Sequence, residues 1–199
     1  MAVALVASTT ACASHAVTRV APEQSIDLSG KWNDTDSRVV AEALIKQSFE
    51  SPYGPNWAIR HAQSNGGTPP RVIVGNVRNR SMEHIAVGTF VKDLERAFVN
   101  SGVVQVVASS DEREEIRSER ADQQENAAAN TRAQQGMETA ANYMLQGEIQ
   151  TIEDSEGGRS VMFYQVDVTL IDLETNAKTW VGQHKIKKYV ERSRLRMEE

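Results

Sequence analysis

The sequence predicts one α/β domain, a mixed β-sheet of about five strands with helices packed on it. Two patterns support this fold class. A strand, a helix and a strand follow one another between Arg71 and Val107, which predicts a parallel strand pair joined by a crossover. Three strand-like segments with short turns between them follow after Tyr143, which predicts an antiparallel meander. Such a sheet needs helices packed against it to bury its apolar face.

The first part of the domain contains two predicted helices and one strand. The first helix runs from about Asp36 to Phe49, with Asp34 or Thr35 as its N-cap. Its apolar stripe at helical spacing comprises Val39, Val40, Ala43 and Leu44. Residues 57–63 form a short second helical turn. The apolar, β-rich run at residues 71–77 is an inner strand.

The best-defined helix is centred on residues 87–98. Its apolar residues follow a spacing of i, i+3, i+4, i+7 and i+11, namely Val87, Phe90, Val91, Leu94 and Phe98. Gly102 stands where a C-cap glycine belongs, and residues 103–107 form the second strand. A long charged helix is expected from Ser110 to about Gln135, because acids crowd its first turn and suit the helix dipole.

The last third of the chain is predicted to be antiparallel. Its strands lie at residues 143–152, 160–173 and 178–188, and turn residues separate them. Apolar and polar residues alternate in the middle strand, so one face should be buried and the other solvated. The apolar set is Tyr164, Val166, Val168 and Leu170, and the polar set is Gln165, Asp167 and Thr169.

The composition argues against several classes of function. The chain has 199 residues and a net charge of -5, which argues against a general nucleic-acid binder. One cysteine cannot form an internal disulfide or a CxxC site, and the four histidines lack ligand spacing, so we expect no metal site and no cofactor. No P-loop, GxSxG, HExxH or GxGxxG motif is present, and we assign no catalytic residue.

The N-terminal segment resembles an export signal. Residues 1–11 are apolar and then small and hydroxylated, and Cys12 follows them. We interpret residues 1–12 as a lipoprotein-type signal segment in which Cys12 receives the lipid. The alternative is a frayed tail with an incidental cysteine. Ala13 follows the cysteine where an acid would favour the inner membrane, so the resemblance points to the outer membrane.

The remaining boundaries follow from composition. Residues 13–30 are polar and lack periodicity, and we interpret them as a flexible tether that spans at most ~65 Å when fully extended. The folded domain is placed at residues 31–192, and residues 193–199 are a charged tail. Basic residues gather near this end: Lys185, Lys187, Lys188, Arg192, Arg194 and Arg196. They could face anionic phospholipid or glycan, or form a solvated end.

Two short segments supply candidate binding residues. Arg78, Asn79 and Arg80 follow a predicted strand, a place where α/β sheets often bind ligands. They could hold an anion or a partner's carboxylate, or form a solvated turn. Asn33 and Asp34 precede the first helix and join them as candidate partner contacts. The acids at residues 34–36 could indicate a divalent-ion site, but the start of a helix explains them better.

Several motifs in order resemble the LpoB family. They are Trp32-Asn33-Asp34-Thr35-Asp36, residues 70–80, Asp122-Gln123-Gln124, Phe163-Tyr164-Gln165-Val166, residues 172–175, Trp180-Val181-Gly182-Gln183 and Ile186-Lys187-Lys188. The resemblance covers residues 28–192. It implies an outer-membrane lipoprotein that activates class A penicillin-binding proteins, the bifunctional peptidoglycan synthases. It also implies a fold like the N-terminal domain of TolB and CsgG proteins, and binding to a small accessory domain of the synthase.

Two functional hypotheses follow. The first is a non-enzymatic, periplasm-facing lipoprotein that binds and stimulates a class A penicillin-binding protein as a monomeric domain. The second is a CsgG-like envelope assembly or secretion accessory that forms a homo-oligomer. An enzyme that acts on cell-wall glycan is a distant third. The tether of residues 13–30 departs from the family, whose well-known members carry a long, proline-rich one.

Overall fold

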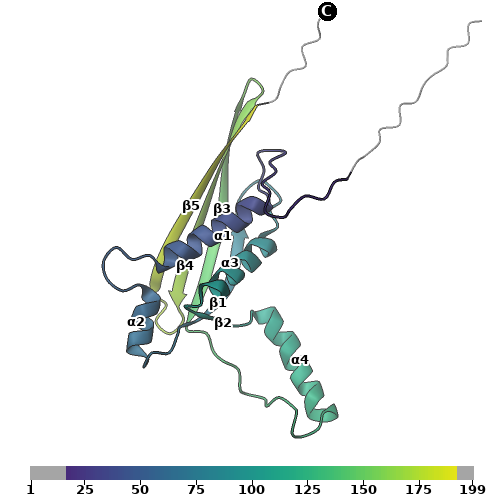
Figure 1. Ribbon diagram of the computed structural model, residues 1–199, viewed down its shortest axis with the longest axis vertical. Coiled ribbons are helices and arrows are strands. Elements are labelled where there is room, and N and C mark those ends of the chain that lie inside the picture. Colours follow the sequence, from purple (N-terminus) through teal and green to yellow (C-terminus); the bar gives the residue numbers. More distant parts are fainter. Residues whose placement is uncertain (1–16, 192–199) are drawn as a thin grey trace, which may run out of the picture.

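The computed structural model describes residues 17–191 (Figure 1). Cys12, the signal segment and the charged tail at residues 193–199 lie outside the described residues. The helices are α1 (Asp34–Phe49), α2 (Trp57–Ser64), α3 (Val87–Ser101) and α4 (Ser110–Asn126). The strands are β1 (Arg71–Asn79), β2 (Gln105–Val106), β3 (Tyr143–Glu156), β4 (Arg159–Asp172) and β5 (Lys178–Glu191). No helix in this part of the chain is both long and apolar enough to cross a bilayer.

The five strands form one mixed sheet in the order β2-β1-β3-β4-β5. β1 runs parallel to both β2 and β3, whereas β3, β4 and β5 pair in antiparallel fashion along their whole length. The predicted fold class, a mixed five-stranded sheet with packed helices, is therefore confirmed. The likeness to TolB and CsgG domains stays a prediction.

The hydrophobic core lies between the sheet and two helices. Figure 1 shows α1 and α3 lying across one face of the sheet. The alternation in β4 is confirmed, because its apolar residues are buried on this side: Tyr164, Val166, Val168 and Leu170. Phe90, Leu94 and Phe98 of α3 are fully buried against them. Full burial of such a side chain contributes roughly 1.5–3 kcal/mol to folding.

The opposite side of the sheet carries polar and half-exposed residues, and we call it the open face. Its side chains come in rows across β3, β4 and β5. Three rows are Gln146–Thr169–Val181, Glu148–Asp167–Gln183 and Gln150–Gln165–Lys185. The β4 members of these rows are half-buried, and the β5 members are exposed. An antiparallel sheet with one solvated face commonly has this pattern.

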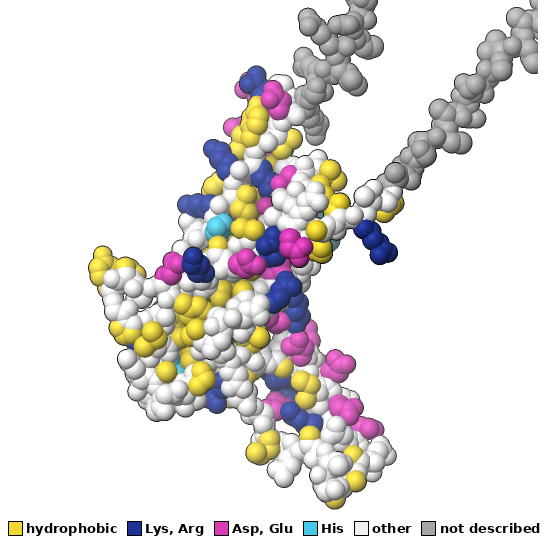
Figure 2. Space-filling model, in the orientation of Figure 1, with side chains coloured by type: hydrophobic (Ala, Val, Ile, Leu, Met, Phe, Trp, Pro, Cys, Tyr) yellow, Lys and Arg dark blue, Asp and Glu magenta, His cyan; other side chains and the backbone are white. Residues whose placement is uncertain are grey.

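Three predicted boundaries differ most from the structure. α1 begins at Asp34, and its N-cap is Asn33 rather than Asp34 or Thr35, because Asn33 and Asp36 form a reciprocal capping box. β2 has two residues instead of the five predicted. α4 ends at Asn126 instead of about Gln135. It buries no residue, so tertiary packing does not prolong it. Figure 2 shows its acidic side chains exposed along the helix, which stands away from the sheet.

Candidate functional site

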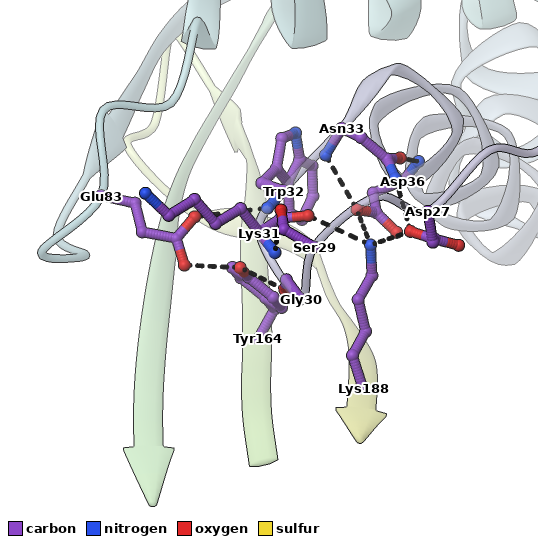
Figure 3. Close-up of polar contacts among 10 residues, drawn as sticks. All are labelled: Asp27, Ser29, Gly30, Lys31, Trp32, Asn33, Asp36, Glu83, Tyr164 and Lys188. Atoms are coloured by element: carbon purple, nitrogen blue, oxygen red, sulfur yellow. Dashed lines mark hydrogen bonds and ion pairs between the residues drawn. The ribbon is translucent and has the colours of Figure 1, made fainter. Parts of the chain in front are cut away.

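Residues 27–32, just before α1, are fastened to the sheet by two polar clusters (Figure 3). We call this region the N-terminal junction. It comprises Asp27, Gly30, Lys31, Trp32, Asn33 and Asp36, together with Glu83, Tyr164 of β4 and Lys188 of β5. Its members come from four separate parts of the sequence, so the junction exists only in the folded chain.

The first cluster is centred on Glu83. The buried Tyr164 hydroxyl donates to Glu83 Oε1 at 2.6 Å, and it also lies 3.0 Å from the Gly30 carbonyl oxygen. The Trp32 backbone N–H donates to Glu83 Oε2 at 3.2 Å. Burial raises the pKa of Tyr164, and the hydrogen bond to Glu83 raises it further. The phenol therefore stays protonated and remains a donor to the carboxylate.

The second cluster is centred on Lys188, whose side chain is only 13% exposed. Its ammonium donates to Asp36 Oδ2 at 2.6 Å, to Asp27 Oδ1 at 2.8 Å and to the Lys31 carbonyl oxygen at 3.2 Å. Burial alone would lower the pKa of Lys188, but the hydrogen bonds to Asp27 and Asp36 outweigh it and raise this pKa. The hydrogen bond from Lys188 lowers the pKa of Asp27.

Apolar packing completes the junction. The Trp32 ring meets Phe90 and Tyr164 edge-on, with ring centroids 5.9 and 5.6 Å apart. Gly30 is buried, and a Cβ atom there would lie 2.6 Å from Val190 Cγ2 and 2.9 Å from Met162 Cγ. Only glycine allows the backbone to approach the end of the sheet so closely. Asp27 and Gly30, inside the predicted tether, thus contact the domain.

The loop after β1 is connected to the junction through Glu83. The Asn79 amide donates to the Glu83 carbonyl oxygen at 2.7 Å, and the Asn79 side-chain oxygen accepts from the Ser81 hydroxyl at 2.6 Å. The Arg80 backbone N–H donates to the Ile149 carbonyl oxygen of β3 at 2.8 Å. These contacts hold the loop at residues 80–83 between the sheet and the N-terminal junction.

The structure places four of the five candidate contact residues at two separate locations. Arg78 and Arg80 lie at the open face, where Arg80 Nε is 3.9 Å from Glu148 Oε2 and Arg78 lines a shallow hollow. The alternative of a solvated turn at residues 78–80 is wrong for Arg78 and Asn79, because β1 continues through Asn79. Asn33 and Asp34 lie instead at the start of α1, over the covered face.

The side chains of the other candidates have different surroundings. Asn33 donates to Asp27 Oδ1 at 2.6 Å and caps α1, so its polar groups are engaged within the domain. Asn79 is engaged with Ser81 and Glu83. Asp34 is exposed. Arg78 and Arg80 are also exposed, and they are the members of the set that share a face of the sheet.

Residues 17–191 contain no group of three or more His, Cys, Asp or Glu side chains placed to hold a metal ion. Asp36, one of the acids considered for a divalent ion, instead accepts from Lys188 and from the Asn33 backbone N–H. His61 lies 3.0 Å from the Tyr143 hydroxyl, and burial followed by the nearby Arg71 lowers its pKa. His184 is half-buried on β5, as a packing residue would be.

Glu83 and Lys178 were missed by sequence reasoning. Glu83 is 81 residues from Tyr164, whose hydroxyl donates to it, so no short sequence pattern could predict this contact. Lys178 lines the same hollow as Arg78, but from β5, because β5 folds back next to β4. One signal was available: a tyrosine at a buried position of β4 needs a partner for its hydroxyl.

One comparison with known proteins shows a family. The sequence model of the peptidoglycan-synthase activator LpoB matches residues 36–186. No curated protein matches the chain. Among solved structures, the LpoB C-terminal domain from Salmonella enterica is 15% identical, with 79% of this chain and 99% of that chain covered and a TM-score of 0.39.

Two further solved structures show similar values. The LpoB C-terminal domain from Escherichia coli is 12% identical, with 77% and 99% covered and a TM-score of 0.42. Lipoprotein GNA1162 from Neisseria meningitidis is 15% identical, with 64% and 88% covered and a TM-score of 0.38. The family model, in contrast, takes in the fold from α1 to most of β5. The chain therefore belongs to the LpoB family of peptidoglycan-synthase activators.

Proposed function

We propose that this protein binds a class A penicillin-binding protein and stimulates its peptidoglycan synthesis, without catalysing a reaction itself. The observation that carries this proposal is the family match over residues 36–186, which spans the folded domain rather than one motif. A binding role needs polar groups that a partner can reach, and the open face supplies the exposed guanidinium groups of Arg78 and Arg80.

The proposed location is the periplasmic face of the outer membrane, with a lipid on Cys12 as the anchor. The pattern of residues 1–12 and the family both support it. Stable membrane attachment usually needs more than one acyl chain, and a triacylated cysteine meets that need. A Cys12→Ser chain should move from the membrane fraction to the periplasmic fraction, and a chain that stays in the membrane fraction would refute the anchor.

A reconstituted synthesis assay tests the function. Purified class A penicillin-binding protein from the same host would be supplied with lipid-linked disaccharide peptide, with and without the Cys12→Ser chain. We expect both glycan polymerisation and peptide crosslinking to accelerate. An unchanged rate with a folded chain would contradict the proposal.

The contact surface has its own test in the same assay. Arg78→Glu combined with Arg80→Glu reverses two charges on the open face, and we expect it to abolish most of the stimulation. Lys46→Glu, on an exposed position of α1, changes the overall charge on the covered side and should leave stimulation intact. Equal stimulation by all three chains would show that Arg78 and Arg80 are not contacts.

Crosslinking in the native host would separate this function from the alternative. Recovery of a class A penicillin-binding protein as the main partner supports activation. Recovery of the chain itself, or of secretion components, would move the function to envelope assembly and leave the family assignment unchanged.

A further inference from the structure

The open face contains a hollow of about 290 Å³ across β1, β3, β4 and β5. Its polar lining consists chiefly of Asn76, Arg78, Gln146, Glu148, Asp167 and Lys178. Two cations, two acids and two amides thus surround one shallow depression. Only those groups that are not already engaged within the domain are available to a ligand.

The two acids are already engaged within the domain. Asp167 accepts from the Gln165 side chain and from the Gln183 side chain, each at 2.7 Å. Glu148 accepts from the Gln150 side chain at 2.7 Å, and its other oxygen lies 3.9 Å from Arg80. Each carboxylate oxygen therefore has a donor or a cation beside it.

The two cations are not engaged. Neither Arg78 nor Lys178 has an acid within 4.0 Å or a side-chain hydrogen bond to any residue between 17 and 191, and both are exposed. The Asn76 and Gln146 amides add further donors to the same lining. The hollow consequently offers more hydrogen-bond donors and positive charge than its own acceptors use.

We propose that this hollow receives the carboxylate of an Asp or Glu side chain from an acidic segment of a protein partner. The inference rests on the proposed function, which makes that partner the synthase. The planar Arg78 guanidinium can hold a carboxylate through two parallel hydrogen bonds, and Lys178 adds a second positive charge. Half-buried Ile171 in the same lining suits the methylene groups of an acidic side chain.

The two acids of the lining decide between a carboxylate and a phosphate. Glu148 and Asp167 repel a ligand in proportion to its negative charge, so a single-charged carboxylate is favoured over a phosphate dianion or a stretch of anionic phospholipid. The side-chain amides of Asn76 and Gln146 in the same lining can also form hydrogen bonds with the backbone of a peptide. The hollow is therefore better suited to a protein segment than to a lipid headgroup.

Equilibrium binding of the full chain carrying Cys12→Ser to the purified synthase tests the proposal. Arg78→Glu combined with Lys178→Glu should weaken binding at least about tenfold, because the carboxylate then faces two negative charges. Lys185 lies on the same face, one row from Glu148 and outside the lining, and Lys185→Glu should change Kd by less than about twofold. The Tm of the Glu double variant must equal that of the wild type. If it is lower, Arg78→Gln combined with Lys178→Gln is used instead.

Two outcomes would overturn the hollow as a carboxylate site. A double variant that binds like the wild type would overturn the hollow as a carboxylate site and leave the proposed function intact. Equal weakening by Lys185→Glu would also overturn it, because the effect would then belong to the general charge of the face.

A wild-type chain that does not bind the synthase would instead refute the proposed function. In that case a photocrosslinker at Gln146 in the native host decides the matter. A crosslink to an Asp- or Glu-rich segment of another protein, lost with Arg78→Glu and Lys178→Glu, would support the hollow. Crosslinks only to lipid or glycan, or none, would overturn it.

Discussion

At the scale of single residues, Tyr164 explains why the N-terminal segment stays on the sheet. Its ring is fully buried in the core, while its hydroxyl reaches the surface layer formed by Glu83 and Gly30. A buried phenol is stable only if its hydroxyl has a partner. Here the partners are a carboxylate from one loop and a backbone carbonyl from another, so one hydroxyl connects three parts of the chain.

Tyr164→Phe should lower the free energy of unfolding by roughly 1–3 kcal/mol, because the half-buried Glu83 carboxylate loses its donor and the buried Gly30 carbonyl loses the hydroxyl beside it. Urea denaturation monitored by circular dichroism would measure it. Tyr189→Phe is the matched control, since Tyr189 is 60% exposed, and it should change stability by less than about 0.5 kcal/mol. Equal small changes in both variants would show that the hydroxyl contributes little.

Among the residues of the junction, the sequence allowed the burial of Tyr164 to be predicted, but not the contacts of Glu83 and Lys188. The alternation in β4 predicts correctly that Tyr164 is buried, because a period of two fixes the face of every residue in a strand. The same pattern says nothing about Glu83, which lies in a loop without periodicity. Lys188 was considered as a basic residue for an anionic surface, yet two carboxylates of its own domain hold it.

At the scale of secondary-structure elements, α4 depends on polar contacts alone. Glu112 accepts from the Ser109 backbone N–H at 2.8 Å, which completes a capping box, and from Lys92 of α3 at 2.6 Å. The hydrogen bond from Lys92, followed by those from Ser109, lowers the pKa of Glu112 to about 2. One half-buried side chain therefore both starts the helix and connects it to α3.

This arrangement predicts that α4 is lost in acid before the sheet. The pKa of Glu112 is lower in the folded chain than its ordinary value of 4.5, so its contribution is complete above pH 4.5 and disappears as the pH falls through about 2. NMR chemical shifts of residues 110–126 should lose helical character over that interval. Glu112→Ala should show the same loss at pH 6.

The control for this prediction is Glu115→Ala, on an exposed position of the same helix, which should keep the helical shifts at pH 6. If Glu112→Ala also keeps them, the capping box and the Lys92 pair do not support α4. The wrong boundary at Gln135 has a related origin. Charge patterns predict where a helix begins, but burial of an apolar face, which α4 lacks, decides how far it continues.

At the scale of the whole molecule, residues that precede the family match already contact the folded domain. The match starts at Asp36, whereas Asp27, Gly30 and Trp32 already contact β4, β5 and the Glu83 loop. A chain that begins at residue 36 should therefore be less stable than one that begins at residue 24, by at least about 2 kcal/mol. Thermal and urea unfolding of the two chains would measure the difference. A difference below about 0.5 kcal/mol would show that the junction is dispensable.

The topology of the sheet could be predicted only in part. Turn residues between neighbouring strands predict the β3–β4–β5 meander, because a short turn forces antiparallel pairing. They do not predict that β1 lies between β2 and β3, since the segments from β1 to β2 and from β2 to β3 are long enough to allow other orders. For the same reason, Arg78 could be predicted as a binding residue from the sequence, but Lys178 could not, because it lines the hollow from β5.

The junction also determines where tension would enter the domain. If Cys12 carries the proposed lipid, a pull on the membrane side would reach Asp27 and Gly30 first and pass through Lys188 and Tyr164 into β5 and β4. These strands belong to the most continuous hydrogen-bonded ladder of the molecule. Lys188 also holds Asp36 of α1, so the load would divide between this ladder and the start of α1.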